Sequence, residues 1–376
     1  MDFQLDETQE SIRRTFRDFV DRKVKPAAAK IDEDREFPAE LFKQVGKLGF
    51  FGMRYPEESG GSGADIVSYC LAAIELARGS LSLAAVSSMQ SLMATYFLHR
   101  FGGEEIRKQY FRAALSGEKI GAICMTEPDA GSDLRAIKTM ATVLGDGFEL
   151  SGQKTWVTSA PVADFFTVLA RTSNHDQLSI FFVPANVDGV LVGKNIEKLG
   201  VCGSVTSEVS FDEVRLPSEY LLGGIGEGTS CLQEILSEIR IMTAALAIGV
   251  ATAAYEDALE YAKTRVQFGK PIGKFQAIKM KLADMAVQLE TAKQMLFYAA
   301  WLSDRDLPRQ KEASIAKLYA SECANSICDE ASRIMASYGY AMEYPVQRYL
   351  RDARFTLIGG GTSEILKMNI AKDLGV

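Results

Sequence analysis

The spacing of apolar residues changes twice along the chain, and each change marks a predicted domain boundary. From residue 6 to about residue 118 the apolar positions recur at helical intervals. Ile12, Phe16, Phe19 and Val20 lie on one stripe of the first segment, and Pro26 interrupts or bends it. This part of the sequence predicts a helical N-terminal domain, residues 1–118.

Between residues 119 and 222 the pattern becomes strand-like. Short runs rich in β-branched and aromatic residues, such as FFTVLART and LSIFFVPA, are separated by turn signals such as Gly-Asp-Gly. A mostly antiparallel sheet or a small barrel is the predicted structure of this middle domain.

From residue 223 to residue 376 the period is helical again. Long segments dense in Ala, Leu, Ile and Met are typical of a helical bundle. The predicted helices cover residues 231–264, 274–303, 308–337, 343–356 and 362–374. The fold class is therefore α+β, with a sheet domain inserted between two helical domains that pack on each other.

Composition narrows the possible functions. With 47% hydrophobic and 24% charged residues, the 376-residue chain is typical of a globular protein of more than one domain. Its net charge of -7 argues against nucleic-acid binding as the main task. The N-terminus lacks the apolar run of a secretory leader, and residues 80–98, although apolar, carry the serines and glutamine of a helix buried in protein.

The cysteines and histidines give no sign of a metal site. The six cysteines contain no CxxC pair, so they are interpreted as reduced thiols of a cytoplasmic protein. The two histidines, His99 and His175, stand far apart and without a cysteine or carboxylate cluster. Neither a zinc site nor a His-dependent triad is expected.

Three stretches could carry chemistry. The first, FTLIGGGTSEILKM at 355–368, places three glycines before a predicted helix. It lacks the lysine of a phosphate-binding loop, so it could simply turn a corner with Thr362 as the N-cap. The second, MTEPDAGSD at 125–133, leaves a strand with small residues that allow a planar ligand to approach the backbone. The third, KTWVTSA at 154–160, offers a tryptophan that is either a core residue or a stacking platform.

Together with RVQFGKPIGKFQ at 265–276 and YGYAMEYPVQRYLRDARF at 338–355, these stretches resemble the acyl-CoA dehydrogenase family. The resemblance spans essentially the whole chain, with the motifs in the right order. It implies a helical N-terminal domain, a middle β-domain and a C-terminal four-helix bundle. It also implies FAD held between these domains, usually in a homotetramer.

The resemblance assigns roles to particular residues. Those that would bind FAD are Met125, Thr126, Gly131, Ser132, Trp156, Thr158, Arg265, Phe268, Gln276, Thr362 and Glu364. The residues Arg265, Phe268 and Gln276 would reach the pyrophosphate and adenosine end of a neighbouring subunit's FAD, where a guanidinium suits a diphosphate. Ser132, Arg240 and Gly360 would contact the substrate. An ordinary ion-paired surface role is the alternative for Arg240 and Arg265.

The catalytic base is where the chain departs from the family. Most relatives carry a glutamate in a loop resembling Ile-Tyr-Glu-Gly-Thr, and Gly360 stands at that position here. Some relatives carry the glutamate directly before the arginine that matches Arg240, but here Ile239 precedes it and Glu238 lies one step earlier. One residue rotates a side chain by about 100° around a helix, so Glu238 is a candidate base only if the helix is irregular there. Its alternative role is a solvated or ion-paired glutamate. A further departure is Arg333 and Ser337, near a stretch that approaches a neighbour's FAD in relatives.

The function implied is α,β-dehydrogenation of an acyl thioester, on CoA or on an acyl-carrier protein. Electrons would pass to an electron-transfer flavoprotein or to oxygen. Loss of the usual base keeps alternatives open: a member whose reaction needs no base, such as an acyl-CoA desulfinase or a flavin monooxygenase. A flavin-binding protein without turnover is a third possibility, from a different class.

Overall fold

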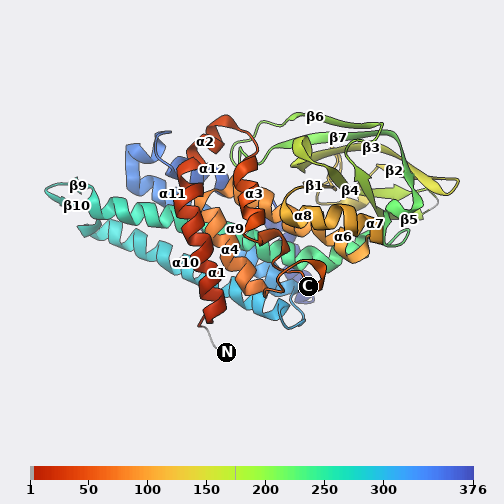
Figure 1. Cartoon of the computed structure of the whole chain (residues 1–376). Helices are drawn as coiled ribbons and strands as arrows, with labels where there is room; N and C mark the ends of the chain where they lie inside the picture. Colours follow the sequence, from red (N-terminus) through yellow and green to blue (C-terminus); the bar gives the residue numbers. More distant parts are fainter. Residues whose placement is uncertain (1–3, 174) are drawn as a thin grey trace.

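The computed structural model describes residues 4–173 and 175–376, and the side chains of His175 and Asp176 lie outside the described part. The first three residues, part of the segment in which no leader was expected, lie outside it as well. Helices occupy the chain up to Ser116, strands run from Gly121 to Leu222, and helices resume at Gly228 (Figure 1). This order confirms the predicted α+β class.

The N-terminal helices begin with a segment that Pro26 does not break. Helix α1 continues through a π-helical turn, Val20–Val24, into α2, where Pro26 occupies the first turn and needs no N–H partner. The helices of this region are α1 (Glu7–Phe19), α2 (Lys25–Asp34), α3 (Ala39–Lys47), α4 (Ile66–Gly79), α5 (Leu81–Ser88), α6 (Thr95–Phe101), α7 (Glu104–Ile106) and α8 (Arg112–Ser116). A second π-helical turn, η4 (Met89–Ala94), joins α5 to α6.

The middle region forms one twisted sheet in the order β6-β7-β3-β2-β4-β5-β8, with β1 also paired to β4. The pairs β1–β4 and β2–β4 are parallel and the others antiparallel, as the strand pattern predicted for most of the sheet. Its strands are β1 (Gly121–Cys124), β2 (Met140–Leu144), β3 (Gly147–Thr158), β4 (Phe165–Thr172), β5 (His175–Pro184), β6 (Val190–Asn195), β7 (Thr206–Pro217) and β8 (Leu221–Leu222).

The C-terminal helices lie close to the predicted ranges: α9 (Gly228–Thr264), α10 (Gln276–Ser303), α11 (Gln310–Met335), α12 (Val346–Thr356) and α13 (Ser363–Asp373). A two-stranded hairpin, β9 (Val266–Gln267) and β10 (Lys270–Pro271), joins α9 to α10. Helices α4 and α9 contribute to one continuous hydrophobic core, so the two helical regions pack on each other as predicted. The sheet has a second, smaller core of its own.

Gln90 fixes the sheet against the helices. Its amide nitrogen donates to the carbonyls of Ala114 and Lys119 at 2.9 and 2.8 Å, and its amide oxygen accepts from the N–H of Gly121 at 3.0 Å. All three contacts of this buried side chain are therefore satisfied. One amide on η4 thus sets where β1 begins.

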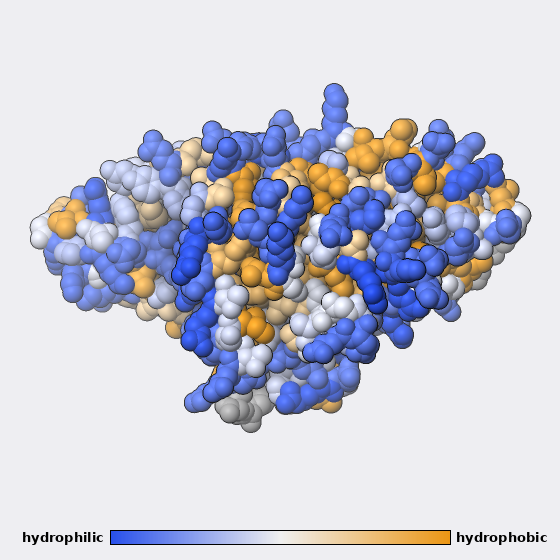
Figure 2. Space-filling view, viewed as in Figure 1, coloured by the Kyte–Doolittle hydropathy of each residue, from blue (hydrophilic) through white to orange (hydrophobic). Residues whose placement is uncertain are grey.

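Two helical runs in the described part are long and apolar enough to cross a membrane, Leu81–Phe101 and Gly228–Thr264, but 89% and 72% of their apolar windows are buried inside the protein. Such burial is typical of interior helices of a globular protein. Apolar atoms also gather on the surface over β6 and β7, where Leu191 and Val192 are exposed (Figure 2). The six cysteines, all within the described residues, are buried and unpaired.

Candidate active site

A bulge in β3 turns Trp156 out of the sheet. The register with β7 shifts between Lys154 and Val157, so Lys154 and Thr155 are both buried and Trp156 leaves its side chain 57% exposed. Trp156 also has a φ of +58°, a left-handed conformation that is costly for a bulky residue. The tryptophan is therefore not a core residue, and its open ring can serve as a platform for a planar ligand.

A buried ion pair holds the loop after β1 against this bulge. Lys154 Nζ lies 2.8 Å from Glu127 Oε1 and also donates to the carbonyl of Met125 at 3.2 Å, while the N–H of Thr155 donates to the carbonyl of Thr126 at 2.9 Å. Burial acts to raise the pKa of Glu127, but hydrogen bonds from Lys154 and Thr139 bring that pKa below its usual value. Met125 and Thr126 are thereby fixed beside Trp156.

The groups around Trp156 leave polar atoms free. Within the described residues, the hydroxyls of Thr126, Ser132 and Thr158 form no hydrogen bond, and Gly131 and Ser132 are exposed. An open aromatic ring flanked by unused hydroxyls and small residues fits a flat heteroaromatic group such as a flavin.

The glycine-rich loop at 359–361 disfavours a side chain at each of its three positions. Gly360 has a φ of +71°, and a Cβ built on it would lie 2.6 Å from Thr243 Oγ1. A Cβ on Gly359 would lie 2.7 Å from the Phe355 ring, and Gly361 has a φ of +104°. Glycine is therefore required by backbone conformation at 360 and 361 and by contact at 359 and 360.

Helices α9 and α11 meet behind this loop. Thr243 donates to the carbonyl of Ile239 at 2.8 Å, and Arg240 Nη1 donates to Ser314 Oγ on α11 at 3.1 Å. One turn further along α11, the fully buried Lys317 donates to the carbonyl of Gly361 at 2.6 Å. Burial lowers the pKa of Lys317 to about 8 and also lowers that of Arg240.

Glu238 lies on another face of α9. The helix is continuous from Gly228 to Thr264, so Ile239 is the residue one turn before Thr243, the side chain that meets Gly360. The Glu238 carboxylate is held by Arg54, on the loop before α4, and by Arg309 Nη2 at 3.7 Å. The irregular helix on which its role as a base depended is absent from this described segment, and the ion-paired alternative describes its surroundings.

The residues expected at the adenosine end lie apart from the others within one chain. The β9–β10 hairpin and the sheet domain stand at opposite ends of the molecule (Figure 1). At the hairpin Phe268 is 93% exposed, and the Arg265 guanidinium lies 5.5 Å from the Tyr338 ring centroid. Gln276 begins α10. These residues cannot meet the Trp156 platform of their own chain.

Thr362 and Glu364 follow the glycine loop. Thr362 is the N-cap of α13 and accepts from the N–H of Ile365 at 3.3 Å, as its sequence context predicted. Glu364 lies in the first turn, where hydrogen bonds from its own N–H and from Thr362 lower its pKa.

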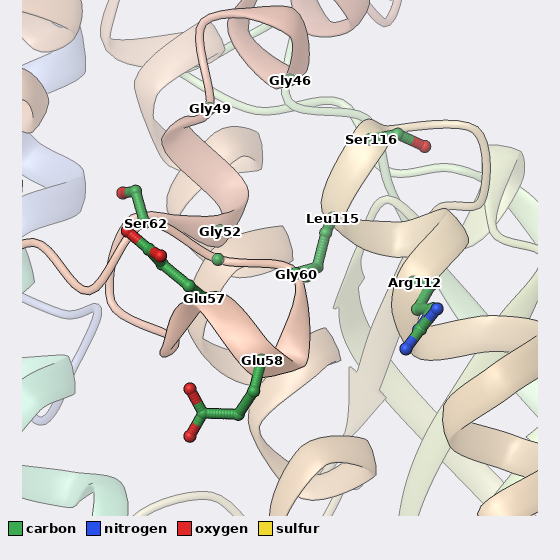
Figure 3. Close-up of a pocket in the computed structure, with 11 residues that line it drawn as sticks. Gly46, Gly49, Gly52, Glu57, Glu58, Gly60, Ser62, Arg112, Leu115 and Ser116 are labelled. Carbon is green, nitrogen blue, oxygen red and sulfur yellow. The ribbon is translucent and has the colours of Figure 1, made fainter.

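A hollow of about 500 Å³ on the N-terminal domain lies away from all of these residues. Glycine-rich turns form one wall, and Glu58 and Arg112 lie on opposite sides of it (Figure 3). None of its lining residues belongs to the expected cofactor or substrate site.

Comparison with known proteins decides the family. Residues 6–118, 122–214 and 226–375 match the N-terminal, middle and C-terminal domains of acyl-CoA dehydrogenases. The chain belongs to the acyl-CoA dehydrogenase family. It is 56% identical to benzylmalonyl-CoA dehydrogenase of Aromatoleum aromaticum, with 100% of each chain covered.

Solved structures agree. Butyryl-CoA dehydrogenase from Megasphaera elsdenii superposes with a TM-score of 0.97 at 36% identity, covering 100% of both chains. A glutaryl-CoA dehydrogenase from Mycobacterium smegmatis in complex with FADH2 gives 0.94 at 32%, covering 98% and 95%. The protein is thus an FAD-dependent oxidoreductase. It removes hydrogen from two adjacent carbon atoms of an acyl thioester.

The sequence pattern did not point to several residues that shape this site. Thr243 carried a usable signal, because it lies three residues after Arg240 and therefore near it on the helix surface. Lys317 in an apolar helical stretch and Lys154 in a strand were further signals, because a lysine inside an apolar pattern indicates a buried charge with a specific partner. The partner of each depends on contacts between distant segments.

Proposed function

We propose that this dehydrogenase acts on thioesters that carry a carboxylate on the α carbon, and that it desaturates them with loss of CO2. The acyl group would be a malonyl unit substituted with an arylmethyl group. The observation that carries the proposal is the missing base: position 360 holds a glycine in a conformation and a contact that exclude a side chain.

Ordinary dehydrogenation removes a proton from the α carbon and a hydride from the β carbon. Backbone amides at 359–361 cannot accept that proton. Glu238, the acid two residues before Arg240, is engaged by Arg54 and Arg309 on a different face of α9. Within the described residues, the three atoms nearest a Cβ at position 360 all belong to Thr243, and the hydrogen bond of Thr243 goes to the carbonyl of Ile239 and not to a carboxylate.

An α-carboxylate removes the need for a base. When the bond between the α carbon and the carboxylate breaks, CO2 leaves and the electron pair stays on the α carbon as a thioester enolate. Departure of the β-hydrogen as hydride then forms the α,β double bond. FAD held at the Trp156 platform would supply the hydride acceptor, so that the products would be the α,β-unsaturated thioester, CO2 and, with one proton from solvent, the reduced cofactor.

The glycine loop would stabilise the enolate oxygen. Within the described residues, the N–H groups of Gly360 and Gly361 donate to no acceptor. Free backbone donors placed where negative charge develops lower the energy of such an intermediate. The same glycines that exclude a side-chain base thus leave two backbone N–H groups without an acceptor among the described residues.

Similarity to benzylmalonyl-CoA dehydrogenase supports the substrate class, since benzylmalonyl-CoA has a carboxylate and a benzyl group on its α carbon. A desulfinase would also need no base at position 360, because its substrate loses a sulfinate. Similarity to this relative favours a carboxylate instead. CoA, or the phosphopantetheine arm of a carrier protein, would carry the acyl group.

The remaining assignments are part of the proposal. Met125, Thr126, Gly131, Ser132, Trp156 and Thr158 would contact the flavin ring, and Thr362 and Glu364 would lie toward the adenosine side. The distant β9–β10 hairpin supports a homotetramer in which Arg265, Phe268 and Gln276 serve a neighbour's FAD. Electrons would pass to an electron-transfer flavoprotein or oxygen, in the cytoplasm.

The test compares benzylmalonyl-CoA with 3-phenylpropionyl-CoA, the same thioester without the carboxylate. Under anaerobic conditions the first should bleach the flavin and release one CO2 for each flavin reduced, with cinnamoyl-CoA as product. The second should leave the flavin oxidised. Equal bleaching by both thioesters would show that a base is present and would refute the proposal.

A further inference from the structure

Two cations, the fully buried Lys317 and the partly buried Arg240, lie behind the glycine loop. Within the described part of the chain, neither Arg240 nor Lys317 forms an ion pair. Each uses only part of its hydrogen-bonding capacity, Arg240 on Ser314 Oγ and Lys317 on the carbonyl of Gly361. Glu322 and Glu364 act on Lys317, and Asp373 acts on Arg240, through space and without a direct ion pair among the described residues. Both cations therefore keep hydrogen-bonding capacity that an anion from outside the chain can use.

The nearest side chain to the vacant position is a neutral hydroxyl. Thr243 is 7% exposed, and its Oγ1 lies 2.6 Å from where a Cβ of residue 360 would be. Arg240 precedes it by three residues, so the two side chains are neighbours on the surface of α9. Lys317 is tied to the loop itself through Gly361. Three elements, α9, α11 and the loop, therefore converge on one point.

We propose that Thr243, Arg240 and Lys317 form the binding site for the α-carboxylate of the substrate. The inference rests on the proposed function, since it takes the carboxylated thioester as the ligand. The carboxylate then occupies the region that a glutamate side chain at 360 would otherwise fill. The substrate then supplies the direct ion-pair partner that neither cation has among the described residues.

The arrangement suits loss of CO2 as well as binding. Charge leaves the carboxylate as CO2 forms, so a cation in direct contact would hold the carboxylate back. Here the closest group is the Thr243 hydroxyl, which now donates to the carbonyl of Ile239 and can rotate its proton toward a ligand. The positive charges of Arg240 and Lys317 favour binding of an anion in front of them.

Malonyl-CoA and acetyl-CoA provide the test, because they differ by a single α-carboxylate and neither has a β carbon from which hydride could leave. Titration calorimetry on the FAD-loaded enzyme measures both dissociation constants without flavin reduction, and chromatography of the sample afterwards shows whether malonyl-CoA has stayed intact. We expect malonyl-CoA to bind at least about tenfold more tightly, the effect of one charge-assisted hydrogen bond.

Variants assign the preference to the site. Thr243→Val, which keeps the shape and removes the hydroxyl, and Arg240→Gln should each bring the ratio of the two constants close to one, while Thr243→Ser should preserve it. Thr252→Val is the matched control, because Thr252 makes the same hydrogen bond, to Ile248 at 2.7 Å, elsewhere on α9. It should leave the ratio unchanged.

The outcomes separate the two proposals. A wild-type ratio near one, or a ratio that survives both Thr243→Val and Arg240→Gln, overturns the carboxylate site whatever the reaction. A preserved preference without CO2 release from benzylmalonyl-CoA retains the site and refutes the decarboxylating function.

Discussion

Replacing Gly360 by alanine adds one methyl group at the point where the chain differs most from its relatives. The left-handed φ of +71° would cost about 1–2 kcal/mol for a residue with a Cβ. The contact of 2.6 Å with Thr243 Oγ1 adds an overpacking cost of about 1–3 kcal/mol. The free energy of unfolding should therefore fall by about 2–5 kcal/mol in Gly360→Ala.

A double-mutant cycle separates the two contributions. Thr243→Ala removes Oγ1 and leaves the Thr243 Cβ, 3.3 Å from the added methyl, as the nearest atom of that residue. In this background most of the overpacking cost is removed, so Gly360→Ala should cost little more than the conformational part, about 1–2 kcal/mol. Urea unfolding followed by circular dichroism gives each value from the midpoint and the slope. FAD must be saturating in every sample, because bound cofactor stabilises the folded state.

Equal costs of Gly360→Ala in the two backgrounds would mean that Thr243 does not restrict position 360. A cost below about 0.5 kcal/mol in both would contradict the conformational argument too, since such values are typical of unconstrained surface positions. Either result would remove the physical reason for the glycine.

Three further predictions concern other parts of the molecule. Lys154→Met leaves Glu127 as an unpaired buried charge, so the free energy of unfolding should fall by about 3–5 kcal/mol. The variant should also retain less FAD, measured as flavin absorbance after gel filtration. Unchanged FAD content would contradict the role of this ion pair. Burial and the nearby Arg240 lower the pKa of Lys317 to about 8, although Glu322 and Glu364 act to raise it. The positive charge of Lys317 is therefore lost as the pH rises through 8. The preference for malonyl-CoA over acetyl-CoA should therefore decline between pH 7 and pH 9 and stay constant in Lys317→Arg, and a decline of equal size in that variant would assign the titration elsewhere. Arg265→Gln should lower the FAD-to-protein ratio of the purified enzyme without changing its circular dichroism, whereas full FAD occupancy would exclude a contact of this arginine with the cofactor.

The periodic spacing of apolar residues was sufficient to predict the C-terminal helices and the order of the three domains. The segment that became α9 was long and apolar enough for its boundary to fall within three residues of the predicted start at residue 231. Strand-like runs with turn residues likewise located the sheet. In both cases the signal lies in neighbouring positions of the sequence.

The site was less accessible because its contacts join distant segments. Exposure of Trp156 depends on a register shift against β7, about fifty residues away in the chain, which no local pattern encodes. The identity of the side chain facing position 360 depends on how α9 is rotated against the loop. Ile239 and Glu238 are consecutive residues and point about 100° apart around the helix axis. Packing of the whole bundle determines which of the two directions faces the loop.

The close approach of Thr243 to Gly360 also limits the evolutionary routes open to this protein. An acidic residue at position 360 would require the threonine side chain to move or to be replaced by a smaller one, since a Cβ there would lie 2.6 Å from Thr243 Oγ1. Replacement of the threonine would itself weaken the recognition of the present substrate. A change between the two chemistries would therefore require coordinated changes at positions 243 and 360.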